Sequence, residues 1–246
     1  MTTHRPWPVP SSPWVLRMTW RDLLFAHWAV RPELVRQLIP ASLELDLFEG
    51  YAWIGAVPFL MENTTARFVP PIPGVHAFPE LNLRTYVKAA GRHESKPGVW
   101  FFSLDAGQRL AVRTARAFFH LPYFDAEFEI GGGPEILYRS RRTHRGAPAA
   151  SFDASYRPMG LTYHTMPGDL DSFLTDRYCL YSADETGTVY RGEIDHAPWP
   201  LQQAEAEVRV NTLGDWLRIP LEGKPQTVHF ARALDVHAWL IQPVRS

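Results

Sequence analysis

The sequence predicts an α+β fold, mainly an antiparallel β-barrel with a few short helices. Many short segments alternate apolar and polar residues with a period of two, as strands with one buried face do. Glycine and proline separate these segments, and only a few stretches carry a helical pattern. Several antiparallel strands accompanied by few helices imply a closed or nearly closed barrel.

Composition points to one domain. The chain has 246 residues, of which 46% are hydrophobic and 13% aromatic, and this is enough apolar surface for a proper core. No internal repeat or linker divides it, so we expect a single domain over residues 1–246. Residues 1–14 are rich in proline and serine and should form an extended arm, pinned to the body by Trp7 and Trp14.

Strands should dominate both halves of the chain. In the N-terminal half we expect them at residues 18–30, 43–47, 51–59, 80–88 and 99–104, with a loop over 62–79. In the C-terminal half we expect them at residues 126–130, 136–143, 149–157, 178–182, 188–194, 226–231 and 235–241.

Four segments favour helices. The first begins at Pro32 and stops at Pro40, in keeping with proline in the first turn and after the last. Residues 108–119 have the strongest helical spacing, residues 168–176 start at Asp169 as a cap, and residues 201–215 form the fourth.

The segment 80–88 alternates most cleanly and therefore assigns its side chains to two faces. One face carries Leu81, Leu83, Thr85 and Val87. The opposite, polar face carries Glu80, Asn82, Arg84, Tyr86 and Lys88.

Several classes of protein are disfavoured. The formal net charge is −1 and no run of like charge reaches five residues, which argues against a nucleic-acid-binding face. No apolar stretch approaches the ~18 residues of a membrane span, and the N-terminus lacks an apolar signal region. We therefore expect a cytoplasmic protein.

Cys179 is the single cysteine, so no internal disulfide can form, and a structural thiol is favoured over a nucleophile.

Four stretches resemble the acetoacetate decarboxylase-like superfamily and, within it, the YqjF-like family of uncharacterised bacterial proteins. The first is residues 21–46, where a strand, a short helix ending at Pro40 and a Leu-Glu-Leu-Asp strand follow one another. The others are Phe119-His-Leu-Pro-Tyr123, residues 190–200 and residues 229–239. Together and in order, these stretches identify the chain as a member and imply the decarboxylase-like barrel.

The resemblance also implies site residues. An arginine that opens the first strand of the decarboxylase matches Arg21, and its pocket glutamate, two positions after an aromatic residue, matches Glu80. The arginine six residues before the proline that precedes the catalytic lysine matches Arg116, and that proline matches Pro122. The position of the catalytic lysine itself holds Tyr123.

Two further positions depart from the family. The second lysine, which tunes the first, matches Phe124, and a second pocket glutamate falls near Gly55. A Schiff base requires an amine that is deprotonated near neutral pH, and tyrosine cannot form the iminium. None of the three lysines of the chain, Lys88, Lys96 and Lys224, has a position that replaces it. We therefore expect no lysine-dependent decarboxylation.

The candidate site residues each have a structural alternative. Arg21 and Glu80 can clamp a carboxylate and act as an acid, or can form a structural salt bridge. His120 and Tyr123 can serve as an acid–base pair, or His120 can cap the C-terminus of a helix. Arg116 is the remaining candidate for substrate binding.

Other chemistries find little support. The ten histidines show no metal-ligand spacing, and there is no Gly-x-Ser-x-Gly motif of a hydrolase. We expect neither a metal nor a cofactor.

Two functions remain open: an enzyme that acts on a small carboxylate or carbonyl compound, as a lyase, hydratase or isomerase, or a binding protein without catalysis. A structural protein whose dimer covers the pocket is a third, and the sequence leaves a homo-oligomer open. No nucleic-acid or membrane partner is expected.

Overall fold

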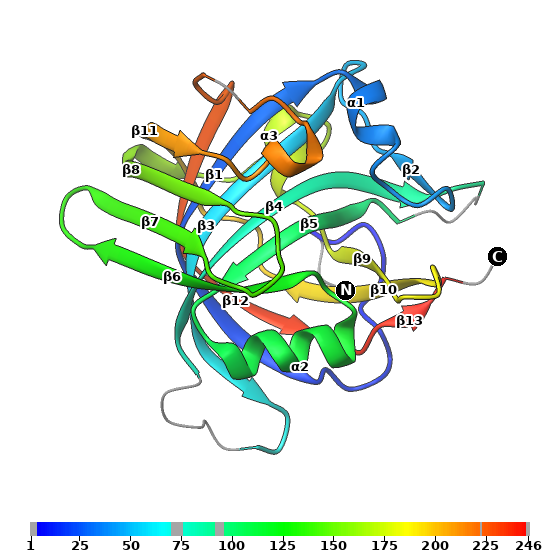
Figure 1. Ribbon diagram of the computed structural model, residues 1–246. Coiled ribbons are helices and arrows are strands. Elements are labelled where there is room, and N and C mark those ends of the chain that lie inside the picture. Colours follow the sequence, from blue (N-terminus) through cyan, green and yellow to red (C-terminus); the bar gives the residue numbers. More distant parts are fainter. Residues whose placement is uncertain (1–3, 70–75, 92–95, 222, 245–246) are drawn as a thin grey trace.

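The computed structural model describes residues 4–69, 76–91, 96–221 and 223–244. Within these residues, strands greatly outnumber helices (Figure 1). The helices are α1 (Pro32–Arg36), α2 (Arg109–Phe119) and α3 (Leu170–Thr175), with a 3₁₀ turn at Asp215–Leu217. The strands are β1 (Leu16–Val30), β2 (Leu43–Leu45), β3 (Ala52–Ala66), β4 (Phe78–Ala89), β5 (Gly98–Ala106), β6 (Tyr123–Gly131), β7 (Ile136–Arg142), β8 (Ser151–Tyr163), β9 (Cys179–Ala183), β10 (Val189–His196), β11 (Leu201–Asn211), β12 (Thr227–Ala238) and β13 (Gln242–Pro243).

All of these strands belong to one large sheet, in the order β13-β10-β9-β5-β6-β7-β8-β11-β12-β1-β3-β4-β2. β4 also pairs with β5, and β10 also pairs with β12. Among the described strands, the parallel pairings are β5–β6 and β5–β9, and the others are antiparallel. The expectation of a mainly antiparallel sheet with a few short helices is confirmed.

Strand β1 carries an irregularity that decides which of its side chains face inward. Asp22 has a positive φ of 53°, and the register between β1 and β3 shifts between Arg21 and Ala26. A bulge of this kind reverses the alternation of faces along a strand. Trp20 before it and Leu23 after it consequently face the same interior space, although they are three residues apart.

Helix α2 lies along the outside of β5 and β6 (Figure 1). Gln108 caps its N-terminus by accepting a hydrogen bond from the backbone N–H of Leu110. The helix ends at His120, which adopts the left-handed conformation with φ 49°. Val112 is its fully buried side chain. The expected helix at 108–119 is therefore confirmed, and α2 carries the chain to the start of β6.

The helix expected over residues 201–215 is wrong, because residues 201–211 form β11. Alanine, glutamate and glutamine have high helix propensity, but Ala204, Ala206 and Val208 also alternate with charged residues. These three side chains pack against the core while their neighbours face solvent between β8 and β12. Sheet pairing on both sides overrides the local preference.

Other differences concern element boundaries. β3 continues to Ala66 into the loop expected over 62–79, of which residues 70–75 lie outside the described chain. The two strands expected near the C-terminus are one continuous strand, β12. In the N-terminal arm, of which residues 1–3 are not described, Trp7 donates a hydrogen bond to Glu193 at 2.8 Å and Trp14 packs on His237.

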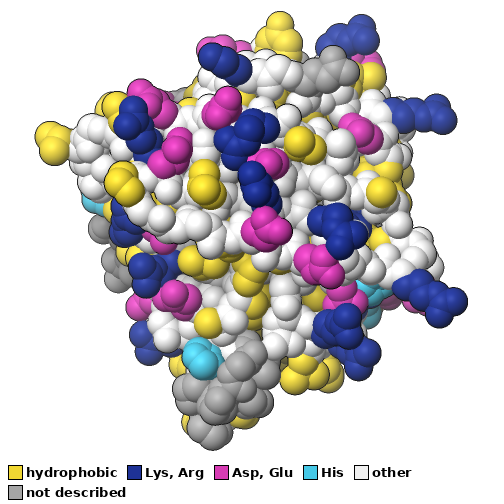
Figure 2. All heavy atoms as spheres, turned by 60° about the vertical axis from the view of Figure 1, so that its left-hand side comes forward, with side chains coloured by type: hydrophobic (Ala, Val, Ile, Leu, Met, Phe, Trp, Pro, Cys, Tyr) yellow, Lys and Arg dark blue, Asp and Glu magenta, His cyan; other side chains and the backbone are white. Residues whose placement is uncertain are grey.

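The surface over β6, β7, β8 and β11 carries charges of both signs. Arginine and acidic side chains alternate across this face (Figure 2), and cross-strand ion pairs such as Arg141–Glu127 and Arg157–Glu205 account for part of the pattern. No single-sign patch is visible on this face. In the described chain, no helix is long and apolar enough to cross a membrane.

Candidate functional site

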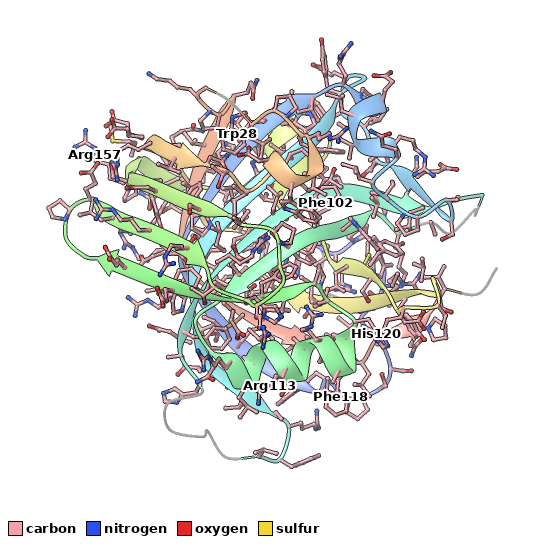
Figure 3. All side chains as sticks on the ribbon, viewed as in Figure 1. Trp28, Phe102, Arg113, Phe118, His120 and Arg157 are labelled. Carbon is pink, nitrogen blue, oxygen red and sulfur yellow. The ribbon has the colours of Figure 1, made fainter. Side chains whose placement is uncertain are left out.

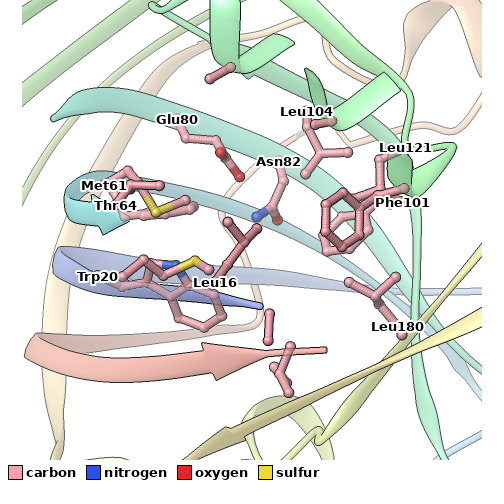
Figure 4. A pocket seen from close by; sticks show the side chains of 18 of the residues that line it. Leu16, Trp20, Met61, Thr64, Glu80, Asn82, Phe101, Leu104, Leu121 and Leu180 are labelled. Atoms are coloured by element: carbon pink, nitrogen blue, oxygen red, sulfur yellow. The ribbon is translucent and has the colours of Figure 1, made fainter. Parts of the chain in front are cut away.

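The interior of the sheet holds a cavity of about 350 Å³. Its wall is built from β1, β3, β4, β5 and one side of α2, with further residues from the start of β6, from β9 and β10, from the end of β12 and from segments next to these strands. Most of the lining is apolar and aromatic, including Phe25, Phe59, Phe101, Leu104 and Trp199. Figure 4 shows Glu80 and Asn82 reaching from β4 into this apolar space, opposite Phe101 and Leu121. An apolar cavity with a few polar groups is the usual form of a small-molecule site.

Glu80 and Tyr123 form the polar centre of the cavity. The Tyr123 hydroxyl donates a hydrogen bond to Glu80 Oε2 at 2.9 Å, and the two side chains come from β4 and the first residue of β6. Glu80 is only 2% exposed and Tyr123 9%. The hydroxyl of Tyr138 donates to the backbone carbonyl of Glu80 at 2.8 Å and so fixes this part of β4 from behind.

Burial controls the protonation of this pair. Desolvation raises the pKa of Glu80 to about 8, although the hydrogen bond from Tyr123 acts in the opposite direction. The pKa of Tyr123 is raised well above its ordinary value, first by burial and then by the neighbouring Glu80. At neutral pH both groups are mainly protonated, so the pair can donate protons, and Glu80 can also accept one near its pKa.

Asn82 and Arg84 follow Glu80 on the same face of β4. Both are buried, with 5% and 9% exposure. Asn82 Oδ1 and Arg84 Nε have no hydrogen-bond partner among the described residues. Arg84 Nη2 donates to the Leu174 carbonyl at 3.0 Å and, at 3.4 Å, to the hydroxyl of Tyr86.

Gly55 lies directly beside Arg84 and His27 in the register of the sheet. A Cβ atom at this position would stand 2.9 Å from the ring of His27 and 3.5 Å from Cγ of Arg84. His27 is held in place by a 2.7 Å hydrogen bond between Nε2 and the Tyr86 hydroxyl. The missing side chain at Gly55 is therefore what allows His27 and Arg84 to pack here.

Two other charged side chains on the cavity wall are neutralised by ion pairs. Arg177 binds Asp46 at 2.6 Å. Glu193 binds Lys96 at 2.6 Å and also pairs with Arg5 of the N-terminal arm. The N-terminal arm thus helps to neutralise the carboxylate of Glu193 on the cavity wall.

The remaining candidates from the sequence do not line the cavity. Arg21 is on the outer side of β1, paired with Glu62 at 3.4 Å, because of the bulge at Asp22. Arg116 lies on the exposed part of α2 and donates to the backbone carbonyl of Tyr123 at 2.8 Å. Arg116 therefore supports the position of Tyr123 from outside.

His120 occupies the C-cap position of α2, which is the structural alternative considered from the sequence. Its ring packs against Tyr190 with the ring centroids 4.9 Å apart. Figure 3 shows His120 at the end of α2, the helix from which Arg113 and Phe118 extend outward. The structure thus brings together Glu80 and Tyr123 of the five predicted residues and places the other three outside the cavity.

The lysines and Cys179 occupy peripheral or buried structural positions. Neither Lys88, Lys96 nor Lys224 is among the described residues that line the cavity. Cys179 is buried, and burial raises the pKa of its thiol to about 12, which keeps it protonated at neutral pH. Within the described residues, no three histidine, cysteine or acidic side chains gather as a metal site would require.

The sequence pattern predicts for Asn82 and Arg84 only that they share a strand face with Glu80. The signal is their alternation with Glu80, because residues i, i+2 and i+4 of a strand share a face. His196 and Trp199 also line the cavity, but they come from the end of β10 and the segment beyond it. No local pattern marks such residues, because only the folding of the sheet brings them to β4.

Comparison with solved structures defines the class of fold. The chain is similar to the enduracididine biosynthesis enzyme MppR complexed with pyruvate, with a TM-score of 0.66, 13% identity and coverage of 94% of this chain and 91% of that one. It is also similar to acetoacetate decarboxylase from Legionella pneumophila, with a TM-score of 0.61, 14% identity and coverage of 99% and 94%. These likenesses show an acetoacetate decarboxylase-like fold.

Sequence comparison identifies the family. The model of the family DUF2071, described as an uncharacterized conserved protein, matches residues 17–235. The uncharacterized protein YqjF of Bacillus subtilis (strain 168) is 47% identical over 232 residues, which cover 94% of this chain and 93% of that protein. The chain belongs to this family, as the resemblance in the sequence predicts.

Proposed function

We propose that this protein binds a small carboxylate or carbonyl compound in the cavity and acts on it by acid–base chemistry that does not involve a Schiff base. The observation that carries the proposal is the hydrogen-bonded pair of Glu80 and Tyr123 in an otherwise apolar space. A carboxyl group with a pKa of about 8 can exchange a proton with a substrate close to neutral pH.

The fold supports this proposal. We interpret the ring of strand pairings from β4 through β1, β12, β8 and β6 back to β5 as the β-barrel that the sequence predicts. MppR, which shares the fold, has been captured with pyruvate, a small carbonyl acid. In the present chain, Tyr123 occupies the position that the family resemblance assigns to the Schiff-base lysine.

In the proposed reaction, Tyr123 donates a hydrogen bond to the carbonyl oxygen. The ionised form of Glu80 removes a proton from the carbon next to that carbonyl, which leaves an enolate at the Tyr123 hydroxyl, and the carboxylic acid so formed on Glu80 returns the proton. Such proton transfers underlie lyase, hydratase and isomerase reactions, and a positioned acid or base contributes about 10²- to 10⁴-fold in rate. Arg21, Arg116 and His120 lie outside the cavity and have no direct contact with the ligand in this scheme.

The test is proton exchange in heavy water. Wild-type protein should exchange the protons next to the carbonyl of 2-oxobutyrate or levulinate, followed by proton NMR. Glu80→Gln should lose this exchange, while Arg113→Gln, on the exposed part of α2, should retain it.

The alternative function is ligand binding without catalysis, favoured by the absence of a lysine at position 123. Thermal stabilisation by these acids without proton exchange would support that alternative over an enzyme. If the same acids neither stabilise the protein nor exchange protons, the proposed function is wrong.

A further inference from the structure

The charges of the cavity wall leave one cation without a counter-ion. Among the described residues that line it, the charged types are Glu80, Arg84, Arg177 and Glu193. Arg177 and Glu193 are in ion pairs, and burial favours the neutral form of Glu80. Arg84 stays charged, because guanidinium does not lose its proton in proteins. No acidic side chain of the described chain pairs with it, so the wall carries a net positive charge at Arg84.

The neighbouring strand supplies no counter-ion to this cation. Gly55, the direct register partner of Arg84 on β3, has no side chain that could place a carboxylate next to the guanidinium. An unpaired buried charge is costly, and a ligand anion is the simplest group that compensates for it.

We propose that Arg84 and Asn82 form a carboxylate subsite at the end of the cavity away from Tyr123. Arg84 Nε is buried and without a partner, and Nη2 is held by the Leu174 carbonyl. The Leu174 contact holds one nitrogen of the guanidinium, Arg84 and Asn82 both line the cavity, and Figure 4 shows the amide of Asn82 directed into it. A planar guanidinium binds a carboxylate with two parallel hydrogen bonds. The carboxylate subsite depends only on the cavity, whereas the position of the ligand's carbonyl group rests on the proposed function.

The spacing along β4 separates the two polar parts of the cavity. Glu80 and Arg84 are four residues apart on one strand, so their Cα atoms are roughly 13 Å apart. A ligand that contacts both therefore carries its carboxylate and its carbonyl group at different ends, with an apolar body between them.

The apolar lining of the cavity fits a ligand whose body, between its two polar groups, is aromatic or aliphatic. Phe25, Phe101 and Trp199 line the same cavity, and Arg84 itself lies 5.5 Å from the ring centroid of Phe25. Such surfaces bury a ring or a short chain at little polar cost. The substrate class is a keto acid with its carboxylate and carbonyl at opposite ends of an apolar body.

The probe for this subsite is 4-acetylphenylacetate, which has a carboxylate and a ketone on opposite sides of a ring. Isothermal titration calorimetry should show that it binds wild-type protein about 10- to 100-fold more tightly than the neutral 4-acetylphenylacetamide, the range expected for hydrogen bonds to a charged group. It should also bind more tightly than pyruvate. Equal binding of acid and amide, or no binding of the acid at millimolar concentration, overturns the proposal without any variant.

Variants then assign the preference to Arg84. Arg84→Gln should abolish the preference for the acid, Arg84→Lys should retain part of it, and Arg113→Gln should retain all of it. A preference that survives in folded Arg84→Gln protein overturns the assignment. Two results together separate this subsite from the acid–base function. Arg84→Gln loses the preference for the acid over the amide, and Glu80→Gln binds the acid as tightly as the wild type does. Either result can fail without the other.

Discussion

The hydroxyl of Tyr123 lies 2.9 Å from Oε2 of Glu80 inside an apolar cavity, and neither side chain has another side-chain hydrogen bond among the described residues. Burial raises the energetic cost of ionising both groups, and Glu80 raises that cost further for Tyr123, whereas the hydrogen bond from Tyr123 lowers it for Glu80. The pair therefore behaves as a coupled acid, and its protonation makes the stability of the protein depend on pH.

The first prediction concerns that pH dependence. Because the pKa of Glu80 is raised from 4.5 to about 8, the folded state binds more protons than the unfolded state between these values. The contribution of protonated Glu80 to the free energy of unfolding is complete below pH 4.5. It is lost as pH rises through about 8, by up to about 1.4 kcal/mol per pH unit. Glu80→Gln should flatten this slope in urea unfolding measured from pH 5 to 8.

Buried histidines act in the opposite direction at lower pH. Burial lowers the pKa of His27 and His196, so the unfolded state binds more protons below about pH 6.5. Subtracting the unfolding free energy of Glu80→Gln from that of the wild type cancels the contribution of these histidines, because both proteins share it. A difference in unfolding free energy that stays constant from pH 5 to 8 would contradict the raised pKa of Glu80.

The second prediction concerns the hydrogen bond itself. Tyr123→Phe removes the donor that lowers the pKa of Glu80, so the pKa should rise further. The lost hydrogen bond should cost about 1 kcal/mol of stability at pH 6. Infrared difference spectra against Glu80→Gln would follow the protonated carboxyl band. A titration of Glu80 that moves to lower pH in Tyr123→Phe would show that the hydrogen bond does not stabilise the carboxylate.

The position of these two residues could be predicted from sequence because both depend on short patterns. Glu80 lies in the most regular alternating strand, and Tyr123 directly follows the helix–proline turn on which the resemblance in the sequence partly rests. The same alternation predicts the face on which Asn82 and Arg84 lie. The subsite that we propose for them could not be predicted, because it depends on the lack of an acid at Gly55 and on the pairing of β3 with β4.

Arg21 shows where the pattern fails. The ungapped match places it at the start of a strand, but the positive φ of Asp22 reverses the alternation and turns Arg21 outward. A single residue with an unusual backbone leaves no strong signal in the sequence, since aspartate adopts this conformation only occasionally. The helix expected over 201–215 failed for a related reason, because its strand identity comes from β8 and β12 rather than from its own residues.

The third prediction tests the absence of Schiff-base chemistry. Borohydride treatment with pyruvate or acetoacetate should leave the intact mass of the wild-type protein unchanged, because no lysine among the described residues lines the cavity. Tyr123→Lys serves as the positive control, since it places an amine beside Glu80 in an apolar space that favours the neutral form. A reduced adduct on the wild-type protein would refute the proposed lysine-independent chemistry.

The fourth prediction concerns the close packing at Gly55. Gly55→Ala would place a methyl group 2.9 Å from the ring of His27, which a hydrogen bond to Tyr86 holds in place. Overpacking of this kind should cost about 1 to 3 kcal/mol. Gly132→Ala is the matched control, because nothing lies within 4 Å of its Cβ position and its φ is not in the left-handed region. Equal melting temperatures for the two variants would show that His27 can move aside.

The fifth prediction concerns a buried ion pair behind the cavity. Arg142 Nε binds Asp105 Oδ1 at 2.7 Å, both side chains are 1% exposed, and the guanidinium lies 4.3 Å from the ring centroid of Phe124. Burial already raises the pKa of Asp105, and the Arg142 guanidinium acts against that rise.

Arg142→Met would therefore leave Asp105 buried without its cation, raise the pKa of that carboxyl further and cost about 3 to 5 kcal/mol in urea unfolding at pH 7. Arg141→Met is the control in the adjacent position of β7, because Arg141 pairs with Glu127 at 2.6 Å in solvent and both side chains are about two-thirds exposed. Loss of the Arg141–Glu127 ion pair should change the free energy of unfolding by less than about 1 kcal/mol. Because Asp105 can be protonated, the cost of Arg142→Met should shrink as pH falls, whereas a cost independent of pH would point to lost packing on Phe124 instead.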